Sequence, residues 1–215
     1  MPVARHLNHL LGSLLLFSLS CGAQTSGVPF ADRTASPSDA MLAARAALPE
    51  ADAPRDWSVG EIAAALKGLH TGLLPAEIAH VSKVIEREAR RAHFSPALVL
   101  AVIRIESSGY TFAKSHKGAL GLMQLLPTTG AYVAGRIRVP WEGPESLYDA
   151  STNVRLGIAY LRQLVNRYGS IHTALAAYNW GPTRISSRLQ RGKSVPAVYA
   201  DRVLAAFGQM QARPA

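Results

Sequence analysis

Apolar residues recur at helical spacing along most of the chain from residue 57 onward. Ser58-x-x-Glu61 forms a capping box ahead of apolar residues three and four apart, and this pattern predicts a helix that starts at Ser58. Pro75 opens a second predicted helix, with one apolar face and a charged face at residues 86–91 that we expect to be solvated. No segment keeps the apolar–polar alternation of a half-buried strand. The pattern therefore indicates helices.

The next predicted helix, residues 97–106, is apolar on nearly all sides. Ser95 and Pro96 precede it as a helix start, a capping residue followed by a proline in the first turn. Its β-branched residues would also permit a strand, but the Ser-Pro start and Gly109 at the far end favour a helix. We expect this helix to lie at the centre of the core and to end at Glu106.

Three further helices follow from the same reasoning. One covers residues 151–168 and ends at Gly169, a shorter one runs from 170 to 179 before Gly181-Pro182, and apolar residues from Val195 to Met210 mark the last. Short glycine and proline breaks join these helices, without an internal repeat or a heptad run. The sequence predicts an all-α fold, a helical globule with one core over residues 57–212.

The N-terminal part has a different composition. Residues 1–23 resemble an export signal, with a short basic start, an apolar stretch too short to span a membrane, and small residues at its end. Residues 24–56 are rich in Ala, Pro, Ser and Asp, which predicts a disordered tether. Cys21, the one cysteine, excludes an intramolecular disulfide and stands where a bacterial lipoprotein box has its lipidated cysteine. The alternative is ordinary cleavage near Ala23.

The charge balance indicates an anionic partner. The chain has 23 Lys and Arg against 14 Asp and Glu, a formal net charge of +9. Nucleic acid, acidic lipid and cell-wall polymer all fit this charge. Basic residues are not interleaved with aromatic ones as a nucleic-acid surface requires, so we expect no nucleic-acid partner. The histidines lack metal-ligand spacing, so we expect no metal site and no cofactor.

Glu106 is the first candidate for chemistry. A carboxylate at the end of an apolar helix is costly unless it is paired, hydrogen-bonded or protonated. Two later stretches also combine polar side chains with chain breaks: "GALGLMQLLP", residues 118–127, and "AYNWGP", residues 177–182. Taken singly, their polar and aromatic residues would be a turn amide, a helix cap or core aromatics. Together with a misplaced acid they indicate a site.

In this order and spacing, the set resembles the soluble lytic transglycosylase family, whose catalytic transglycosylase SLT domain has a goose-lysozyme-like helical fold. The resemblance covers a core at about residues 80–210. It rests on Glu106-Ser107 ending a buried helix, a serine nine residues beyond the acid, and Gly-Leu-Met-Gln at 121–124. The helix "NVRLGIAYL", residues 153–161, and the stretch "ALAAYNWGP", residues 174–182, are also similar to family motifs. The resemblance implies a lysozyme-like all-α fold with a catalytic groove.

The resemblance also implies a function, a peptidoglycan lytic transglycosylase that cleaves the MurNAc–GlcNAc β-1,4 bond without water and leaves 1,6-anhydromuramic acid ends. Glu106 would be the catalytic acid and then the base. The expected substrate-binding residues are Ser115, Met123, Gln124, Tyr178, Asn179 and Tyr199. Ser107 would orient the acid or cap the helix. The implied partner is the peptidoglycan glycan strand, and we expect a monomer in the periplasm, or an outer-membrane lipoprotein facing it if Cys21 is lipidated.

Two alternatives remain open from the residues. Glycosidases normally use a second carboxylate, and none lies between Ser107 and Trp141. A distant acid could still make the protein a hydrolytic muramidase of the same fold; the candidates are Glu142, Glu145, Asp149 and Asp201. The other alternative is a catalytically silent peptidoglycan-binding scaffold.

Overall fold

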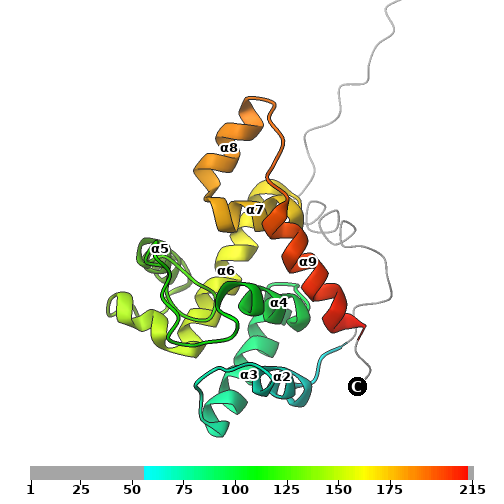
Figure 1. Ribbon diagram of the computed structural model, residues 1–215. Coiled ribbons are helices and arrows are strands. Elements are labelled where there is room, and N and C mark those ends of the chain that lie inside the picture. Colours follow the sequence, from blue (N-terminus) through cyan, green and yellow to red (C-terminus); the bar gives the residue numbers. More distant parts are fainter. Residues whose placement is uncertain (1–55, 213–215) are drawn as a thin grey trace, which may run out of the picture. The chain divides into compact units, whose positions relative to one another are not determined.

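The computed structural model describes residues 56–212, which form eight α-helices and one short 3-10 helix (Figure 1). The helices are α2 (Val59–Lys67), α3 (Pro75–Arg91), α4 (Pro96–Ser107), α5 (Pro127–Ile137), η1 (Pro144–Tyr148), α6 (Ala150–Tyr168), α7 (Ile171–Trp180), α8 (Pro182–Gln190) and α9 (Val198–Gln211). No strand occurs within 56–212, so the all-α prediction is confirmed there. The expected signal at 1–23 with Cys21, and the tether apart from its last residue, lie outside the described residues.

Helix α4 is the central helix, and its strand alternative is wrong. Every residue from Ala97 to Ile103 is buried, as the nearly uniform apolar sequence predicts. The Ser95 hydroxyl accepts from the backbone N–H of Ala97 at 3.2 Å and caps the first turn. Helix α9 packs along α4, and α2 and α3 also contact it (Figure 1). This packing brings the C-terminal turn of α4, which carries Glu106, close to the start of α9.

Helix α6 connects the two hydrophobic cores. It packs against α3 and α7 on the side of the larger core, and against α5 and η1 on the side of the smaller one. The smaller core is built from α5, α6, η1 and the loop that follows α4; its buried residues are Leu120, Leu125, Val133, Ala134, Val139, Leu147 and Leu156. The loop after α4 is therefore anchored to α6 through a core of its own.

Helix boundaries agree with the sequence where caps are strong. Ser58 and Glu61 form the predicted capping box of α2, and Pro75 lies in the first turn of α3. Helix α6 begins earlier than predicted, because the Asp149 carboxylate accepts from Thr152 N–H at 2.7 Å and is the cap. Helix α9 begins at Val198, so Val195 lies outside it.

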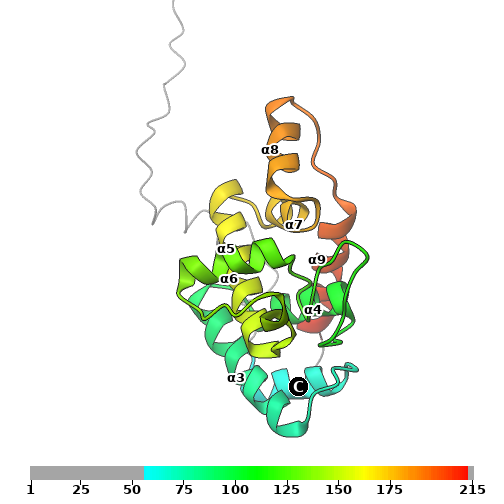
Figure 2. The same cartoon turned by 90° about the vertical axis from the view of Figure 1, so that its left-hand side faces the viewer.

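Two α-helices were not predicted from the sequence. Helix α5 begins at Pro127, and α8 begins at Pro182, where a helix stop was predicted. Both views show α8 projecting from the end of α7 (Figure 1, Figure 2), and of the described elements it packs mainly on α7. None of the described helices is both long and apolar enough to cross a membrane.

Candidate active site

Glu106 lies in the last turn of α4 and is half-buried. Burial raises the pKa of its carboxyl from 4.5 to about 7, because a carboxylate loses hydration there. A hydrogen bond from Tyr199 and the positive charge of Arg202 act in the opposite direction and lower the pKa. A pKa of about 7 means that a large share of the carboxyl groups holds a proton at neutral pH, as a general acid must.

Tyr199, in the first turn of α9, is the direct partner of this acid. Its hydroxyl donates to Oε1 of Glu106 at 2.5 Å, across 93 positions of sequence. The side chain is buried, and burial together with the Glu106 charge raises the pKa of Tyr199 well above 10. The phenol therefore remains a neutral donor. The structure brings together Glu106 and Tyr199, two of the expected site residues.

Tyr178, near the end of α7, is a second tyrosine influenced by the charge of this acid. Burial and then the charge of Glu106 raise the pKa of Tyr178 well above 10, so its hydroxyl stays neutral. The hydroxyl donates to the carbonyl of Met123 at 2.8 Å, and the ring packs on Tyr160 with centroids 5.3 Å apart. Tyr178 thus joins α7 to the loop after α4.

Gln124 and Ser115 shape that loop. Gln124 has a left-handed backbone, φ 48°, and its Nε2 donates to the carbonyls of Ala113 and Gly121, both at 3.0 Å. The Ser115 hydroxyl accepts from Ala119 N–H at 3.0 Å. Within residues 56–212, the Gln124 amide oxygen has no protein donor. That oxygen therefore keeps its capacity to accept from a ligand.

Ser107 fastens the same loop to the end of α4. Its hydroxyl lies 2.8 Å from the carbonyl of Leu122 and 3.2 Å from that of Ile103, and it accepts from Gly109 N–H at 3.1 Å. These partners are all backbone groups. Of its two expected roles, helix capping fits these bonds, and orientation of the acid would act only through the loop.

Met123 and Asn179 differ from the sequence interpretation. The Met123 residue is fully buried, so the expected contact of its thioether with a sugar is wrong for this conformation. Its side chain packs against Gly157, where a Cβ atom would lie 2.4 Å from Sδ. Asn179 is exposed in the last turn of α7 and does not cap it, because the cap is Gly181. A substrate contact of Asn179 stays a prediction.

Asn153 is a supporting residue to which sequence reasoning gave no role. It is fully buried in α6; its Nδ2 donates to the carbonyls of Leu120 and Leu147, both at 2.9 Å, and its Oδ1 accepts from Met123 N–H at 2.8 Å. The amide is thus bonded on both its oxygen and its nitrogen, to the loop and to η1. A polar residue inside an apolar helical pattern was the signal in the sequence.

The charged groups that shift the pKa of Glu106 do not include a carboxylate. Of the four distant acids, Asp149 caps α6, and Asp201 is largely exposed and pairs with His172 at 3.2 Å. Glu142 and Glu145 are not buried. No described residues form a cluster of three side chains able to hold a metal ion. The site over residues 56–212 therefore offers one acid, with the neutral Tyr199 hydroxyl as its donor and the positive charge of Arg202 acting on it.

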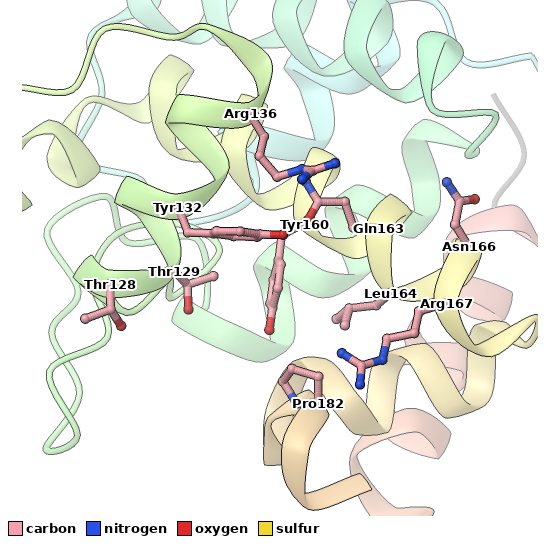
Figure 3. Close-up of a pocket in the computed structure, with 10 residues that line it drawn as sticks. All are labelled: Thr128, Thr129, Tyr132, Arg136, Tyr160, Gln163, Leu164, Asn166, Arg167 and Pro182. Carbon is pink, nitrogen blue, oxygen red and sulfur yellow. The ribbon is translucent and has the colours of Figure 1, made fainter. Parts of the chain in front are cut away.

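A cavity of about 620 Å³ lies beside this site, and we call it the α5–α6 cavity (Figure 3). Its lining residues are Thr128, Thr129, Tyr132 and Arg136 of α5, Tyr160, Gln163, Leu164, Asn166 and Arg167 of α6, and Pro182 of α8. Glu106 is not among them. The cavity adjoins the acid only through Tyr160, whose ring contacts Tyr178.

Residues 83–197 match the family model described as the transglycosylase SLT domain. Among curated relatives, the transglycosylase of Enterobacteria phage PRD1 is 35% identical over 116 residues, 54% of this chain and 40% of that protein. The soluble lytic murein transglycosylase of Salmonella typhimurium is 34% identical over 105 residues, 48% and 16% of the two chains. The membrane-bound lytic murein transglycosylase C of Cronobacter sakazakii is 32% identical over 108 residues, 46% and 30%. The chain spans less than half the length of these relatives.

Two solved structures share the fold. The 70 kDa soluble lytic transglycosylase of Escherichia coli superposes with a TM-score of 0.57 at 22% identity, over 83% of this chain and 31% of that one. An inactive mutant of the lytic transglycosylase Slt from Pseudomonas aeruginosa, with a glutamate replaced by glutamine, gives 0.50 at 25% identity, over 83% and 29%. The expected lysozyme-like helical fold is confirmed by the first of these.

Proposed function

The chain belongs to the transglycosylase SLT domain family, and from this premise we propose that it is a peptidoglycan lytic transglycosylase. It cleaves the β-1,4 bond between MurNAc and GlcNAc without water and leaves a 1,6-anhydromuramic acid end. The relatives named as lytic murein transglycosylases support this substrate. The observation that carries the proposal is Glu106, a half-buried acid with a pKa of about 7, held by Tyr199, and without a carboxylate neighbour among the described residues.

In the first step, protonated Glu106 donates its proton to the glycosidic oxygen as the bond to the anomeric carbon breaks. Burial keeps this proton available at neutral pH, because it disfavours the ionised acid before the reaction. As the carboxylate forms, the Tyr199 hydroxyl stabilises its charge by donation to Oε1. The same neighbour therefore holds the acid in place and stabilises it after proton loss.

In the second step, the Glu106 carboxylate accepts the proton of the muramyl C6 hydroxyl. The hydroxyl oxygen attacks the anomeric carbon, and the new C–O bond closes the 1,6-anhydro ring. The acid ends the cycle protonated, and no water is consumed. A one-carboxylate site suits this scheme, because the two-carboxylate mechanisms need a nucleophile or base opposite the acid.

Several neutral side chains are proposed to hold the sugars during these steps. The unpaired amide oxygen of Gln124 can accept from a sugar hydroxyl or acetamido N–H, and exposed Asn179 can do the same. The hydroxyls of Ser115 and Tyr178 bond to backbone groups of the loop after α4, and their remaining lone pairs can accept from the substrate. Ser107 keeps the loop at the end of α4. Positive charge on the anomeric carbon would be stabilised largely by the substrate's own acetamido group.

Mass spectrometry of the products released from purified peptidoglycan tests the proposal. We expect anhydro ends from the wild type, and none from Glu106→Gln, which should still fold and bind the wall. The inactive glutamate-to-glutamine mutant of the Pseudomonas aeruginosa structure supports this expectation. Glu145→Gln is the matched control, because it makes the same change at an exposed acid and should leave cleavage unchanged.

The two alternative functions predict different results. Reducing ends in place of anhydro ends would show a hydrolytic muramidase, and loss of activity in Glu145→Gln would point to a second acid. A silent scaffold would bind peptidoglycan equally before and after Glu106→Gln and would release no product from either. A hydrolytic muramidase needs a second carboxylate near Glu106, and none of the charged groups that shift the pKa of Glu106 is a carboxylate.

We also propose export to the periplasm, with residues 1–23 as the signal and residues 24–56 as a tether. A flexible segment of this length would have a mean end-to-end distance of about 30 Å. The existence of a relative named as membrane-bound supports an outer-membrane form attached through Cys21. Membrane fractionation of the wild type against Cys21→Ala tests this: lipidation predicts loss of membrane association in the variant, and ordinary cleavage predicts no difference. Size-exclusion chromatography tests the expected monomer.

A further inference from the structure

The α5–α6 cavity is large and polar enough to bind a ligand in its own right. Its volume of about 620 Å³ falls in the range of small-molecule sites, roughly 300–1,000 Å³. Figure 3 shows its residues extending from facing sides, with α5 on one side and α6 on the other. None of these residues belongs to the proposed catalytic set.

The cavity begins where the two catalytic stretches end. Thr128 follows Gln124 by four residues, and Pro182 follows Asn179 by three, so both sides of the cavity continue from the proposed sugar-binding residues. In its wall, the Tyr160 ring packs against Tyr178, which lies in the field of Glu106. The lining of the cavity is therefore connected to the neighbourhood of Glu106 through two packed tyrosine rings.

The charged residues that line the cavity are positive and lack acidic partners among the described residues. Arg136 and Arg167 are its two charged residues, and no Asp or Glu lines it. Within the described part of the chain, neither arginine forms an ion pair. Arg136 lies over the Tyr132 ring at 5.8 Å, and Arg167 lies over the Tyr168 ring at 5.4 Å. These neutral contacts orient the guanidinium groups and leave their charge free for an anion.

Arg167 is oriented further by a hydrogen bond. Its Nη2 donates to the Ser186 hydroxyl of α8 at 3.0 Å, and that hydroxyl also lies 3.0 Å from the hydroxyl of Tyr168. The Tyr168 hydroxyl donates to the carbonyl of Pro182, a lining residue. Through this chain of bonds, α8 holds Arg167 at the side of the cavity. An arginine so oriented can form two parallel bonds to a carboxylate with less loss of side-chain freedom.

The remaining lining selects for amides as well as for charge. Gln163 and Asn166 supply two amide side chains, Thr128 and Thr129 supply hydroxyls, and the tyrosines supply ring faces. We propose that the α5–α6 cavity is a subsite for the carboxylate-bearing stem peptide of a peptidoglycan strand whose sugars occupy the catalytic site. This assignment rests on the proposed function, because the stem peptide is attached to the same muramyl sugars that Glu106 acts on.

Binding of an inactive form to two matched polymers tests the subsite. In a Glu106→Gln background, affinity is measured for glycan strands that carry stem peptides and for the same strands after amidase digestion removes the peptides. We expect tighter binding to the peptide-bearing strands. Arg136→Gln with Arg167→Gln should weaken that binding by roughly tenfold, since each arginine would lose a charge-assisted bond. The same double variant should bind the peptide-free strands within about twofold of its parent.

Lys83→Gln with Arg191→Gln is the control for overall charge. Both residues are exposed, lie outside the cavity and have no side-chain bond among the described residues, so the net charge changes equally without loss of the subsite. We expect this control to retain the preference for peptide-bearing strands. Equal weakening by both double variants, or equal weakening on both polymers, would overturn the subsite and leave only a general basic field.

Three other results would also overturn the subsite. Stronger competition by a phosphate-bearing wall polymer than by free stem peptide would assign the arginines to a different ligand. Absence of binding to either strand would remove the proposed function as well, whereas equal binding to both strands, together with anhydro products from the wild type, would remove the subsite alone. The two failures are therefore distinguishable.

Discussion

At the scale of single residues, the ionisation of Glu106 depends on neighbours that act in opposite directions. Burial disfavours the carboxylate, and Tyr199 and Arg202 favour it. The balance is a pKa of about 7, so the acid is neither permanently charged nor permanently neutral near physiological pH. A site that must release and regain one proton within a cycle requires such a balance.

Tyr199→Phe should shift this balance in a defined direction. Loss of the donated hydrogen bond removes a group that lowers the pKa of Glu106, so that pKa should rise above 7. The alkaline limb of the kcat/KM profile should move to higher pH, and kcat should fall by about tenfold or more because the carboxyl is less well held. A pH–rate profile on soluble glycan strands checks both effects.

Tyr110→Phe is the control for Tyr199→Phe, because it removes the hydroxyl of an exposed tyrosine that lies outside the proposed catalytic set. Its alkaline limb should coincide with that of the wild type. An unchanged alkaline limb in Tyr199→Phe would mean that the phenol does not influence proton release from Glu106.

The raised pKa of Glu106 also carries a stability cost with a definite sign. The folded state binds this proton more tightly, with a pKa of about 7 against 4.5, so wild-type stability falls as pH rises through this window. The shift corresponds to roughly 3 kcal/mol above pH 7. A glutamine side chain cannot ionise, so the stability of Glu106→Gln relative to the wild type should increase by about this much between a pH near 4 and a pH near 8. Urea unfolding at both pH values measures the difference, and a pH-independent difference would contradict it.

The sequence points to the proposed reacting residue but not to the residues that support it. Glu106 is predicted because a carboxylate interrupts an apolar pattern, and Tyr199 because the family resemblance implies it. The role of Asn153 depends on three backbone partners up to 33 positions away, and local patterns contain no such information. Met123 was misassigned because an apolar side chain in a motif fits a sugar contact and a core position equally well; Gly157 decides the matter.

At the scale of elements, α6 positions the catalytic loop. Asn153 holds the loop backbone by hydrogen bonds, and Gly157, one turn further along the helix, leaves space for the Met123 side chain. Gly121 is required on the other side of this contact: it has φ 78°, and a Cβ there would lie 2.2 Å from Asn153 Nδ2. The close contact between the loop and α6 thus requires glycine at both 121 and 157.

Gly157→Ala and Gly135→Ala should have opposite effects on stability. Both glycines are helical, so alanine gains up to about 1 kcal/mol of helix propensity at each. At Gly157 the new Cβ would lie 2.4 Å from Met123 Sδ, and the overpacking should destabilise the protein by about 1–3 kcal/mol. At Gly135 no atom lies within 4 Å, and the propensity gain should remain. Chemical denaturation compares the two variants.

Activity separates these two variants as well. Met123 contributes its N–H to Asn153 and its carbonyl to Tyr178, so displacement of Met123 by the added methyl group of Gly157→Ala should lower kcat. Gly135→Ala should retain wild-type kcat. Gly157→Ala with full stability and full activity would show that the loop adjusts freely, which contradicts a rigid support.

The elements that sequence patterns missed are those with little buried surface. Helix α5 buries Gly130, Val133 and Ala134 only, and α8 buries Ile185 only, so the apolar stripe that marks a core-facing helix is short in α5 and reduced to one residue in α8. Pro182 was taken as a stop, although a proline is as suitable in a first turn as after a last one. The well-predicted helices α3, α4 and α6 have several buried residues each.

At the scale of the whole helical unit, the proposed catalytic acid depends on how α9 is docked. Its first turn carries Tyr199, and Tyr199, Val203, Ala206 and Met210 are buried along its length. At its far end, Gln211 accepts a hydrogen bond from the indole Nε1 of Trp57 at 3.1 Å, across 154 positions. Trp57, at the start of the helical unit, therefore secures the C-terminal end of α9, and the N-terminal end of α9 carries Tyr199, the partner of Glu106. A change at Trp57 is far from Glu106 in sequence but should reach it through α9.

Two shortened chains, one beginning at Asp56 and the other at Ser58, test this dependence and the predicted domain boundary together. The chain from Asp56 should keep the stability and kcat of the longer protein, because residues 24–56 have a composition that does not favour ordering. The chain from Ser58 lacks Trp57, a buried indole at 8% exposure, and should lose about 3 kcal/mol, the usual cost of removing a large aromatic from a core. It should also lose activity, as α9 and Tyr199 are held less firmly.

Urea unfolding and product formation on peptidoglycan measure the two effects. Equal stability of the two chains would show that Trp57 does not secure α9. A large loss of stability already in the chain from Asp56 would show that the helical unit extends into residues 24–55.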